Sequence, residues 1–234
     1  MIEFGPSKFD SEVTGLNVLR VHVRALSDVE AVRQLVLGKK CDLLFAITHD
    51  FGLLGDLCSA GWVGTVDVRY DFEKKDTGKG SEIMFPGVRV TDPEAIRPLA
   101  EAAFGGGGFF SDRRLQPFEA KWYGTWAENA VKDGRCVRAI LTEGKVSAFL
   151  IGRLEPEHQV GRVELIAVDP VQRSNGLGEA LMKQFALSLP VGWACRVKTA
   201  VDRVRTMQFY QRVGYKPLAA EAMVSLWVKE ARND

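Results

Sequence analysis

The chain has 234 residues, 46% of them hydrophobic, and its 31 basic and 30 acidic residues leave a net charge of +1. This length can bury one large core or two small ones. The near-zero charge argues against long-range attraction to nucleic acid or acidic membranes. No apolar run reaches the ~18 residues of a membrane span, and residues 1–10 lack a basic segment followed by an apolar one. We therefore expect a soluble, cytoplasmic protein with no nucleic-acid or membrane partner.

The cysteines and histidines do not form a recognisable metal or nucleophile motif. The four cysteines are widely separated, and no C-x-x-C pair occurs among Cys41, Cys58, Cys136 and Cys195. They are expected to be reduced thiols that pack as small hydrophobic groups. None of the three histidines, His22, His49 and His158, has a sequence neighbour suited to nucleophilic catalysis. The sequence predicts no metal site.

Alternation and helical periodicity predict a first α/β block. Ser27 and Glu30 have the spacing of a capping box at a helix start. The predicted elements are strand 17–24, a helix from Ser27 to about Gly38, strand 42–48, a short helix within 50–60 and strand 62–72. Residues 71–81 are polar and Gly-rich, as a loop or linker would be. We place a domain boundary there, dividing the chain into 1–80 and 81–234.

The second block has an order of elements typical of an α/β or α+β sheet domain. Its predicted elements are strand 85–90, a helix capped by Asp92 with a kink or late start at Pro98, helix 118–131, strands 135–142, 145–153 and 160–168, helix 176–189, strand 196–200, helix 204–213 and strand 222–229. Between the first two helices, four glycines at 105–108 precede the aromatic and basic segment 109–114. A loop of that length and composition is usually functional.

One pattern occurs in both blocks. Gly61-Trp62 and Gly214-Tyr215 each follow a predicted helix and precede a predicted strand. The first block is therefore either a truncated copy of the second fold or a chance likeness, because such units are common.

The most informative segment is the loop between strand 163–168 and the next helix. Gly176 and Gly178 open that helix, and glycines let backbone N–H groups approach a bound anion. The helix N-terminus adds free donors and a positive dipole end, and Arg173 adds a cation. This arrangement is typical of a pyrophosphate site. The alternative is an ordinary turn in which the glycines serve packing, since neither the P-loop nor the dinucleotide pattern is present.

Two motifs carry a family resemblance. Arg173-x-x-Gly176-x-Gly178, after a strand ending Ala-Val-Asp-Pro, resembles the acetyl-CoA motif of the GNAT superfamily of N-acetyltransferases. Phe209-Tyr210-Gln-Arg-Val-Gly-Tyr215 resembles the second hallmark of that superfamily, and one helix and one strand separate the two motifs. The resemblance covers about residues 90–229. It implies a GNAT fold, a mixed sheet flanked by helices, preceded here by a smaller degenerate GNAT-like α/β domain.

The resemblance also implies acetyl-CoA as co-substrate and a set of residues that hold it. Strand 163–168 would splay from its neighbour, and the pantetheine arm would pair with its free backbone groups. The implied coenzyme-binding residues are Ile166, Ala167, Val168, Arg173, Ser174, Asn175, Gly176, Leu177, Gly178 and Glu179. Arg203 stands where many members have Asn. It would contact a coenzyme phosphate or the acceptor, or face water.

Acetyl transfer needs a proton acceptor for the ammonium and a proton donor for the thiolate. The resemblance places the Tyr210 hydroxyl near the thioester sulfur, and a phenol with a pKa of about 10 is protonated at neutral pH. Glu164, two residues before Ile166, is the candidate base, directly or through water. Alternation along the strand places Glu164, Ile166 and Val168 on one face. The alternatives are structural: Tyr210 would be an aromatic residue of the core, and Glu164 a solvated carboxylate on the strand.

A narrower resemblance concerns the acceptor. Residues 9–15, the separate first block and residues 123–129 are similar to the dTDP-fucosamine acetyltransferase family, which acetylates a dTDP-linked amino sugar. Aromatic side chains could stack on a base and arginines could pair with the diphosphate. The candidate acceptor-binding residues are Phe110, Arg113, Arg114, Tyr123 and Trp126. The four-residue spacing of Trp122 and Trp126 also fits helix core positions.

Other functions stay open at this point. The acceptor could be another small amine or a protein amino group, although the basic Arg113-Arg114 pair does not favour a peptide. A non-catalytic acyl-CoA-binding module is the alternative from a different class, and retention of Tyr210 argues against it. Exposed strand edges often pair, so a homodimer is one expected assembly.

Overall fold

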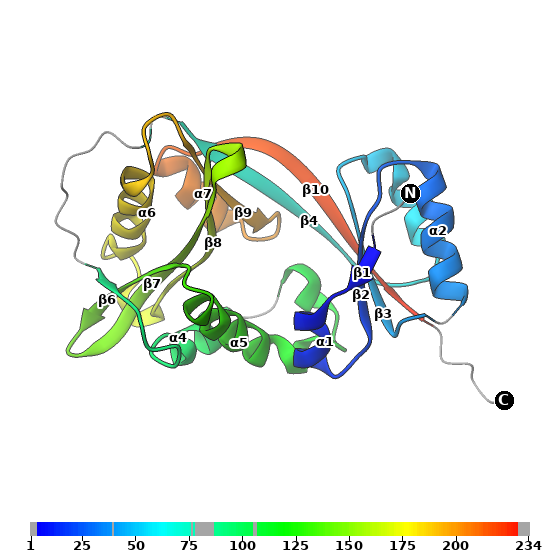
Figure 1. Cartoon of the computed structure of the whole chain (residues 1–234), viewed down its shortest axis with the longest axis horizontal. Helices are drawn as coiled ribbons and strands as arrows, with labels where there is room; N and C mark the ends of the chain where they lie inside the picture. Colours follow the sequence, from blue (N-terminus) through cyan, green and yellow to red (C-terminus); the bar gives the residue numbers. More distant parts are fainter. Residues whose placement is uncertain (1–3, 39, 76, 78–86, 105–106, 229–234) are drawn as a thin grey trace.

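A single β-sheet organises the fold. The computed structural model describes residues 4–38, 40–75, 77, 87–104 and 107–228 (Figure 1). Within these residues the strands form one ten-stranded sheet in the order β1-β2-β3-β10-β4-β9-β8-β7-β6-β5. The pairs β2–β3 and β8–β9 are parallel, and the other pairs are antiparallel. The expected mixed sheet flanked by helices is confirmed.

The elements have the following bounds. The strands are β1 (Phe4–Pro6), β2 (Val18–His22), β3 (Leu43–Thr48), β4 (Trp62–Lys74), β5 (Val88–Arg89), β6 (Cys136–Thr142), β7 (Lys145–Glu155), β8 (Val160–Val168), β9 (Ala194–Ala200) and β10 (Lys216–Trp227). The α-helices are α1 (Lys8–Thr14), α2 (Leu26–Leu37), α3 (Leu54–Ser59), α4 (Arg97–Ala103), α5 (Glu119–Lys132), α6 (Leu177–Ser188) and α7 (Val204–Arg212). Short 3-10 turns are η1 (Phe51–Leu53), η2 (Gly108–Ser111), η3 (Gln116–Phe118), η4 (Pro156–His158) and η5 (Pro170–Gln172).

Helices cover both faces of the sheet at its two ends. In the first block, α2 and α3 bury Val32 and Leu57 against Leu44 of β3 and Val224 of β10. In the second block, α6 and α7 bury Phe185 and other apolar side chains against β7, β8 and β9. Helices α4 and α5 pack on the opposite face of β6, β7 and β8. The amphipathic patterns of the sequence thus become helices that pack their apolar sides directly against the faces of one sheet.

Strands β4 and β10 join the two halves of the chain. Strand β10 pairs with β3 on one side and β4 on the other, and β4 also pairs with β9. Figure 1 shows β4 and β10 as a long ribbon that arches between the two ends of the molecule. A strand of the first block therefore lies between two strands of the second block. The division into 1–80 and 81–234 stays a prediction.

Several local expectations were wrong. Helix α2 begins at Leu26, and the Asp28 carboxylate accepts the N–H groups of Arg24 and Ala25. This cap forms in place of the Ser27–Glu30 box because Asp28 reaches back to those two amides. Strand β4 continues through 71–74, inside the expected linker, because it pairs with β9. Strand β10 likewise begins at Lys216 instead of residue 222, since it pairs with the end of β4.

The helix predicted after Asp92 starts late, as Pro98 indicated. It begins at Arg97 with Pro98 in its first turn, where a missing N–H is tolerated. Some expectations lie outside the described residues, namely residues 76 and 78–81 of the linker, residues 85–86 of a strand, Gly105, Gly106 and Lys229. Among the described helices, none is long and apolar enough to span a bilayer.

Candidate active site

A V-shaped opening in the sheet forms the centre of the site. The parallel β8–β9 ladder ends at the pair Val163↔Val197. Beyond that pair, β8 stays with β7 as far as Val168, and β9 stays with β4 as far as Ala200. The two strands diverge, as the sequence resemblance implied. Among the described residues, the far half of β8 therefore has a backbone edge without a strand partner. Such an edge can accept an extended ligand arm.

The glycine loop at the mouth of this opening has anion-binding geometry. Gly176 is the N-cap of α6 with a left-handed φ of +77°, and a Cβ there would meet nothing within 4 Å. The first helical hydrogen bond runs from the Ala180 N–H to the Gly176 carbonyl at 2.9 Å. The amides of Leu177, Gly178 and Glu179 precede it, so they are available to a ligand. This is the arrangement that binds a phosphate group.

Arg173 lies where the loop meets the cleft. Its Nε is 3.4 Å from the Val168 carbonyl, and a guanidinium nitrogen is 3.5 Å from the Ala103 carbonyl at the end of α4. The cation is thus held between the end of β8 and the end of α4, in the cleft that the α6 N-terminus also lines. Ser174 takes a positive φ of 67°, which turns the chain between Arg173 and the helix.

One cleft of about 1690 Å³ joins the loop, the V-shaped opening and the aromatic helix α5. The predicted site residues that line it are Tyr123, Trp126, Glu164, Ile166, Ala167, Val168, Arg173, Ser174, Gly176, Leu177, Gly178, Glu179, Arg203 and Tyr210. The remaining predicted residues, Phe110, Arg113, Arg114 and Asn175, do not line it. The structure therefore brings the implied coenzyme loop and the candidate proton donor together in one cavity.

Tyr210 lies on α7 at the inner wall of the cleft. It is only 3% exposed and packs against Phe72 of β4 at 5.7 Å between ring centroids. Burial raises the pKa of Tyr210 above its usual range. The hydroxyl consequently keeps its proton through the neutral and mildly alkaline range. A protonated phenol on the cleft wall can serve as a proton donor.

Glu164 occupies a β-bulge, which the sequence did not reveal. The register passes from Ile151↔Leu165 to Gly152↔Val163, so Glu164 is the extra residue of β8. Its carboxylate contacts the guanidinium groups of Arg135 and Arg153. Ile166 and Val168 instead pack in the cluster beneath α6. The prediction that alternation places Glu164 on their face was wrong, because the bulge adds one residue to the period of two.

The predicted arginine and Phe110 contacts to an acceptor lie away from the cleft. Phe110 is 1% exposed and packs among core residues beneath α5. Arg113 is exposed. Arg114 makes two bonds to Asp112 and stacks 4.2 Å from the ring centroid of Trp227. The 3-10 turn η2 turns Phe109, not Phe110, toward the cleft.

Tyr123 and Trp126 of α5 form an aromatic wall of the cleft, and their contact with an acceptor stays a prediction. Tyr123 stacks on Phe104 at 4.2 Å between ring centroids, and Trp126 lies nearly parallel to it at 6.5 Å. Burial and the nearby Glu119 raise the pKa of Tyr123 to about 12. Its hydroxyl is therefore neutral at physiological pH.

Sequence reasoning missed the polar floor of the cleft. Its charged side chains come from β4, β8, β9 and β10, and they include Asp67, Arg69, Asp71, Arg162, Lys198 and Glu221. Lys198 lies between Glu221 at 2.7 Å and Asp71 at 3.5 Å. The available signal was the alternation in strand 62–72, which places charges at 67, 69 and 71 on one face. From the sequence alone, that face would be assigned to solvent, because only the tertiary structure shows η2 and α5 packed over it.

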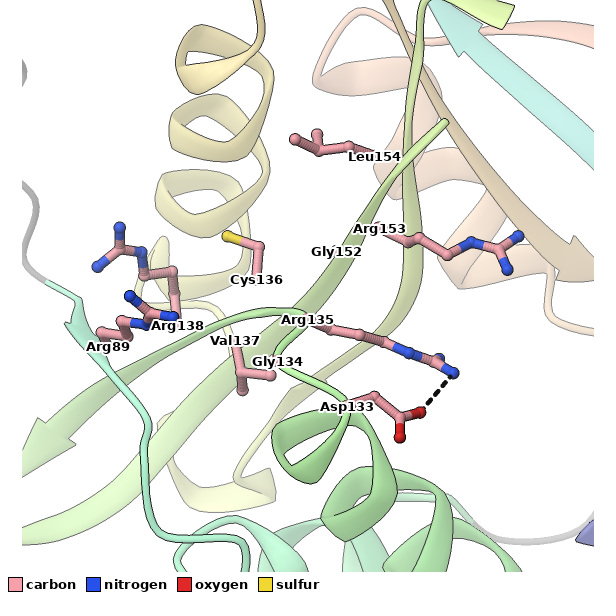
Figure 2. A pocket seen from close by; sticks show the side chains of 10 residues that line it. All are labelled: Arg89, Asp133, Gly134, Arg135, Cys136, Val137, Arg138, Gly152, Arg153 and Leu154. Carbon is pink, nitrogen blue, oxygen red and sulfur yellow. Dashed lines mark hydrogen bonds and ion pairs between the residues drawn. The ribbon is translucent and has the colours of Figure 1, made fainter. Parts of the chain in front are cut away.

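A second, smaller pocket of about 570 Å³ lies at the start of β6 (Figure 2). Four arginines line it, but Arg135 and Arg153 extend to one side, whereas Arg89 and Arg138 extend to the other. Arg135 also pairs with Asp133. The cations do not converge on one point, so this pocket lacks the geometry of an anion site. Within the described residues, no three His, Cys, Asp or Glu side chains gather to hold a metal ion.

The comparisons with known proteins agree with this geometry. The family described as "Acetyltransferase (GNAT) family" matches residues 96–215, more than half of the chain. The chain belongs to the GNAT acetyltransferase family. Members of this family take acetyl groups from acetyl-CoA. No curated protein matches the chain.

Solved GNAT structures share the fold over most of the chain. A GCN5-related N-acetyltransferase from Sphaerobacter thermophilus aligns with a TM-score of 0.60 at 12% identity, covering 98% of this chain and 76% of its own. A GNAT-family protein from Novosphingobium aromaticivorans aligns with a TM-score of 0.57 at 15% identity, covering 90% and 84%. A tandem GNAT protein from the clavulanic acid biosynthesis pathway aligns with a TM-score of 0.57 at 13% identity, covering 92% and 76%. At these identities the likeness concerns the fold alone.

Proposed function

We propose that this GNAT protein transfers the acetyl group of acetyl-CoA to a primary amine of a small molecule. One observation carries the proposal: the α6 amides, the splayed edge of β8 and the Tyr210 side chain face a single cleft. Acetyl-CoA supplies the activated thioester. The ammonium first gives one proton to a base. The neutral amine nitrogen then bonds to the acetyl carbon as the carbon–sulfur bond breaks, and the second proton that the nitrogen loses replaces the one that the thiolate takes from its donor.

The chain's own residues divide these tasks. The amides of Leu177, Gly178 and Glu179, with Arg173, would bind the pyrophosphate. Tyr210 would protonate the departing thiolate, because its hydroxyl keeps its proton in the buried site. Glu164 would receive the ammonium proton through a water molecule, since its two oxygens already contact Arg135 and Arg153. A pH–rate profile that keeps its acid limb in Glu164→Gln would remove Glu164 from this role.

A nucleotide-linked amino sugar, such as a dTDP-4-amino-4,6-dideoxyhexose, is the second proposed acceptor. The aromatic wall of Tyr123 and Trp126 supports it, because these rings could stack on a nucleotide base. The diphosphate would need Arg69 or Arg203 as its partner, since Arg113 and Arg114 lie outside the cleft. Release of coenzyme A thiol with such sugars, but not with simple amines, would favour this acceptor.

We further propose that residues 1–80 are a degenerate copy of the GNAT unit. In each block a helix, then a Gly-aromatic pair, precedes a long strand: α3 and β4 in one, α7 and β10 in the other. The two strands pair antiparallel with each other. Expression of residues 81–234 alone tests the dependence of the second block on the first. It should yield an insoluble or unfolded chain, because β4 would be missing from between β9 and β10.

Gly176→Val tests the proposed function directly. A β-branched residue is strained at a φ of +77°, and its side chain would enter the open space in front of the α6 amides. Calorimetry should show acetyl-CoA affinity lowered by more than tenfold. Gly192→Val is the matched control, because Gly192 also has a positive φ of +87° and open space around it but lies outside the cleft. Equal loss of affinity in both variants, or none in Gly176→Val, would contradict the proposal.

A further inference from the structure

The two ends of the cleft differ in their balance of charge. On the floor beneath η2 and α5 the cations are matched, since Arg69 pairs with Asp67 and Lys198 pairs with Glu221. At the end where α6 and α7 begin, the cleft is also lined by the exposed side chains of Arg173, Arg205 and Arg212. None of these arginines forms an ion pair within the described residues. Even with the nearby Glu179 of α6, positive charge is in excess at this end.

The starts of α6 and α7 lie at the same edge of the sheet. Strands β8 and β9 run parallel, and each is followed by one of these helices. Both helix N-termini, with their free N–H groups and positive dipole ends, therefore point toward the same side of the cleft. The two helices also touch, because a Cβ at Gly178 in the first turn of α6 would lie 3.4 Å from the Phe209 ring of α7.

The charges at the start of α7 are opposite to those that stabilise a helix. Arg203 is the N-cap and Arg205 lies in the first turn, which contains no acidic residue. Positive side chains at a helix N-terminus are unfavourable, because they repel the positive end of the dipole. Asp202 pairs with Arg203 at 4.0 Å, whereas Arg205 has no such partner in the described part of the chain. Helix stability therefore does not explain an arginine at position 205, but a bound anion would.

Arg205 and Arg212 lie on one side of α7. Phe209 comes four residues after Arg205 and three before Arg212, and residues with these spacings are neighbours on a helix surface. The Arg212 guanidinium lies 5.8 Å from the centroid of the Phe209 ring. Since Phe209 touches the start of α6 at Gly178, both arginines lie on the side of α7 that faces the proposed pyrophosphate loop.

The chemistry of coenzyme A matches this excess of positive charge. Beyond its pyrophosphate, which the α6 amides and Arg173 would hold, it carries a phosphate monoester at the 3′ position of the ribose. Such a group has a charge of about −1.5 to −2 at neutral pH. Guanidinium groups bind it with paired, charge-assisted hydrogen bonds.

We infer that Arg205 and Arg212 bind the 3′-phosphate of the donor and thereby select thioesters of free coenzyme A. An acyl group on the phosphopantetheine arm of a carrier protein lacks this phosphate, so it would be a poor donor. The inference rests on the proposed acetyl transfer and adds the class of donor that the site accepts.

Calorimetry with three ligands tests the inference without an acceptor. The ligands are coenzyme A, 3′-dephospho-coenzyme A and 4′-phosphopantetheine, the arm of a carrier protein. The intact protein should bind coenzyme A about tenfold or more tightly than the 3′-dephospho form, and 4′-phosphopantetheine more weakly still. In the double variant Arg205→Gln/Arg212→Gln the ratio should fall to about threefold or less, because only the affinity for coenzyme A depends on the 3′-phosphate contact.

Arg24→Gln is the matched control. Arg24 is also exposed and also lies at the start of a helix, α2, but it does not line the cleft, so this variant should keep the full ratio. Equal affinity for coenzyme A and its 3′-dephospho form, a ratio that survives the double variant, or tighter binding of 4′-phosphopantetheine would overturn the inference. Absence of binding of all three ligands to the intact protein would instead overturn the proposed function.

Discussion

Two buried aspartates, Asp10 and Asp67, have opposite electrostatic surroundings. Both are nearly inaccessible, at 2% and 4% exposure. Asp10 accepts bonds from Ser7, from Arg20 Nε at 2.7 Å and from Trp122 Nε1 at 2.9 Å. Burial alone would raise the pKa of Asp10, but these donors outweigh it and hold the pKa below its usual value. The pKa of Asp67 moves the other way.

The difference separates a contact between the two blocks from the floor of the cleft. Asp10 of α1 is bonded to Trp122 of α5, so it fastens the first block to the second. Its charge is satisfied by the protein itself. Asp67 lines the cleft floor, where it pairs with Arg69 and where burial raises its pKa. Changes at the Asp10 junction should therefore affect stability, and changes in the cleft should affect catalysis or binding.

The largest effect is expected on the cleft side, at the proposed proton donor. Tyr210→Phe removes only a hydroxyl, so kcat should fall by roughly 10²- to 10⁴-fold while acetyl-CoA affinity and melting temperature change little. Tyr215→Phe is the matched control, because that buried hydroxyl bonds to Cys195 and does not line the cleft. Steady-state kinetics and calorimetry measure both variants. An unchanged kcat in Tyr210→Phe would exclude the role.

At the Asp10 junction the expected effect is on folding. Asp10→Asn should lower the free energy of unfolding by about 2–3 kcal/mol, because it removes the charge that pairs with Arg20 and the acceptor for Ser7. Urea denaturation measures this loss. Glu12→Gln, an exposed change on the same helix, should stay within about 0.5 kcal/mol. A change in kcat/KM without a change in stability in Asp10→Asn would contradict the structural role of Asp10.

The contributions of the two aspartates to folding stability should change in opposite directions with pH. The native pKa of Asp10 is depressed from 3.8, so its stabilisation is present above that value and is lost as pH falls through the native pKa. The native pKa of Asp67 is raised from 3.8, so its charge destabilises the fold as pH rises through the native value.

Melting temperatures of Asp10→Asn and Asp67→Asn between pH 3 and 7 should show this opposition. The deficit of Asp10→Asn relative to the wild type should shrink in acid. The relative stability of Asp67→Asn should instead rise toward neutral pH, by a few degrees, since about 1 kcal/mol corresponds to ~2–4 °C at this size. Parallel pH dependence of the two variants would contradict the assignment of the two environments.

The smallest effects are expected at the arginines outside the cleft. Arg113→Ala should leave kcat and both KM values within about twofold, because Arg113 is exposed and does not line the cleft. Arg114→Ala should cost about 1 kcal/mol of stability through its contacts with Asp112 and Trp227, without altering kinetics. A large rise in the KM for the acceptor in Arg113→Ala would instead support the sequence-based prediction that Arg113 binds a nucleotide diphosphate.

Local sequence determined the parts of the site that depend on neighbouring residues. Gly176 and Gly178 after a strand and before an amphipathic helix predicted the loop, and the left-handed φ of Gly176 shows why glycine is needed there. The late start of α4 followed from Pro98. Strands β6 to β9 were predicted within a few residues because their apolar patterns are set by burial on a sheet.

Tertiary pairing decided the rest. The bulge that redirects Glu164 depends on the register of β7 against β8, and no periodicity within one strand reveals it. The floor that holds Asp67 and Glu221 exists because β4 and β10, distant in sequence, pair beside β9. Likewise, Phe109 faces the cleft and Phe110 the core because η2 packs under α5. The sequence by itself determined the glycine loop at the start of α6 and the position of Tyr210 on α7. Long-range strand pairing and packing decided which charged and aromatic side chains meet them, because those contacts join residues that no local pattern relates.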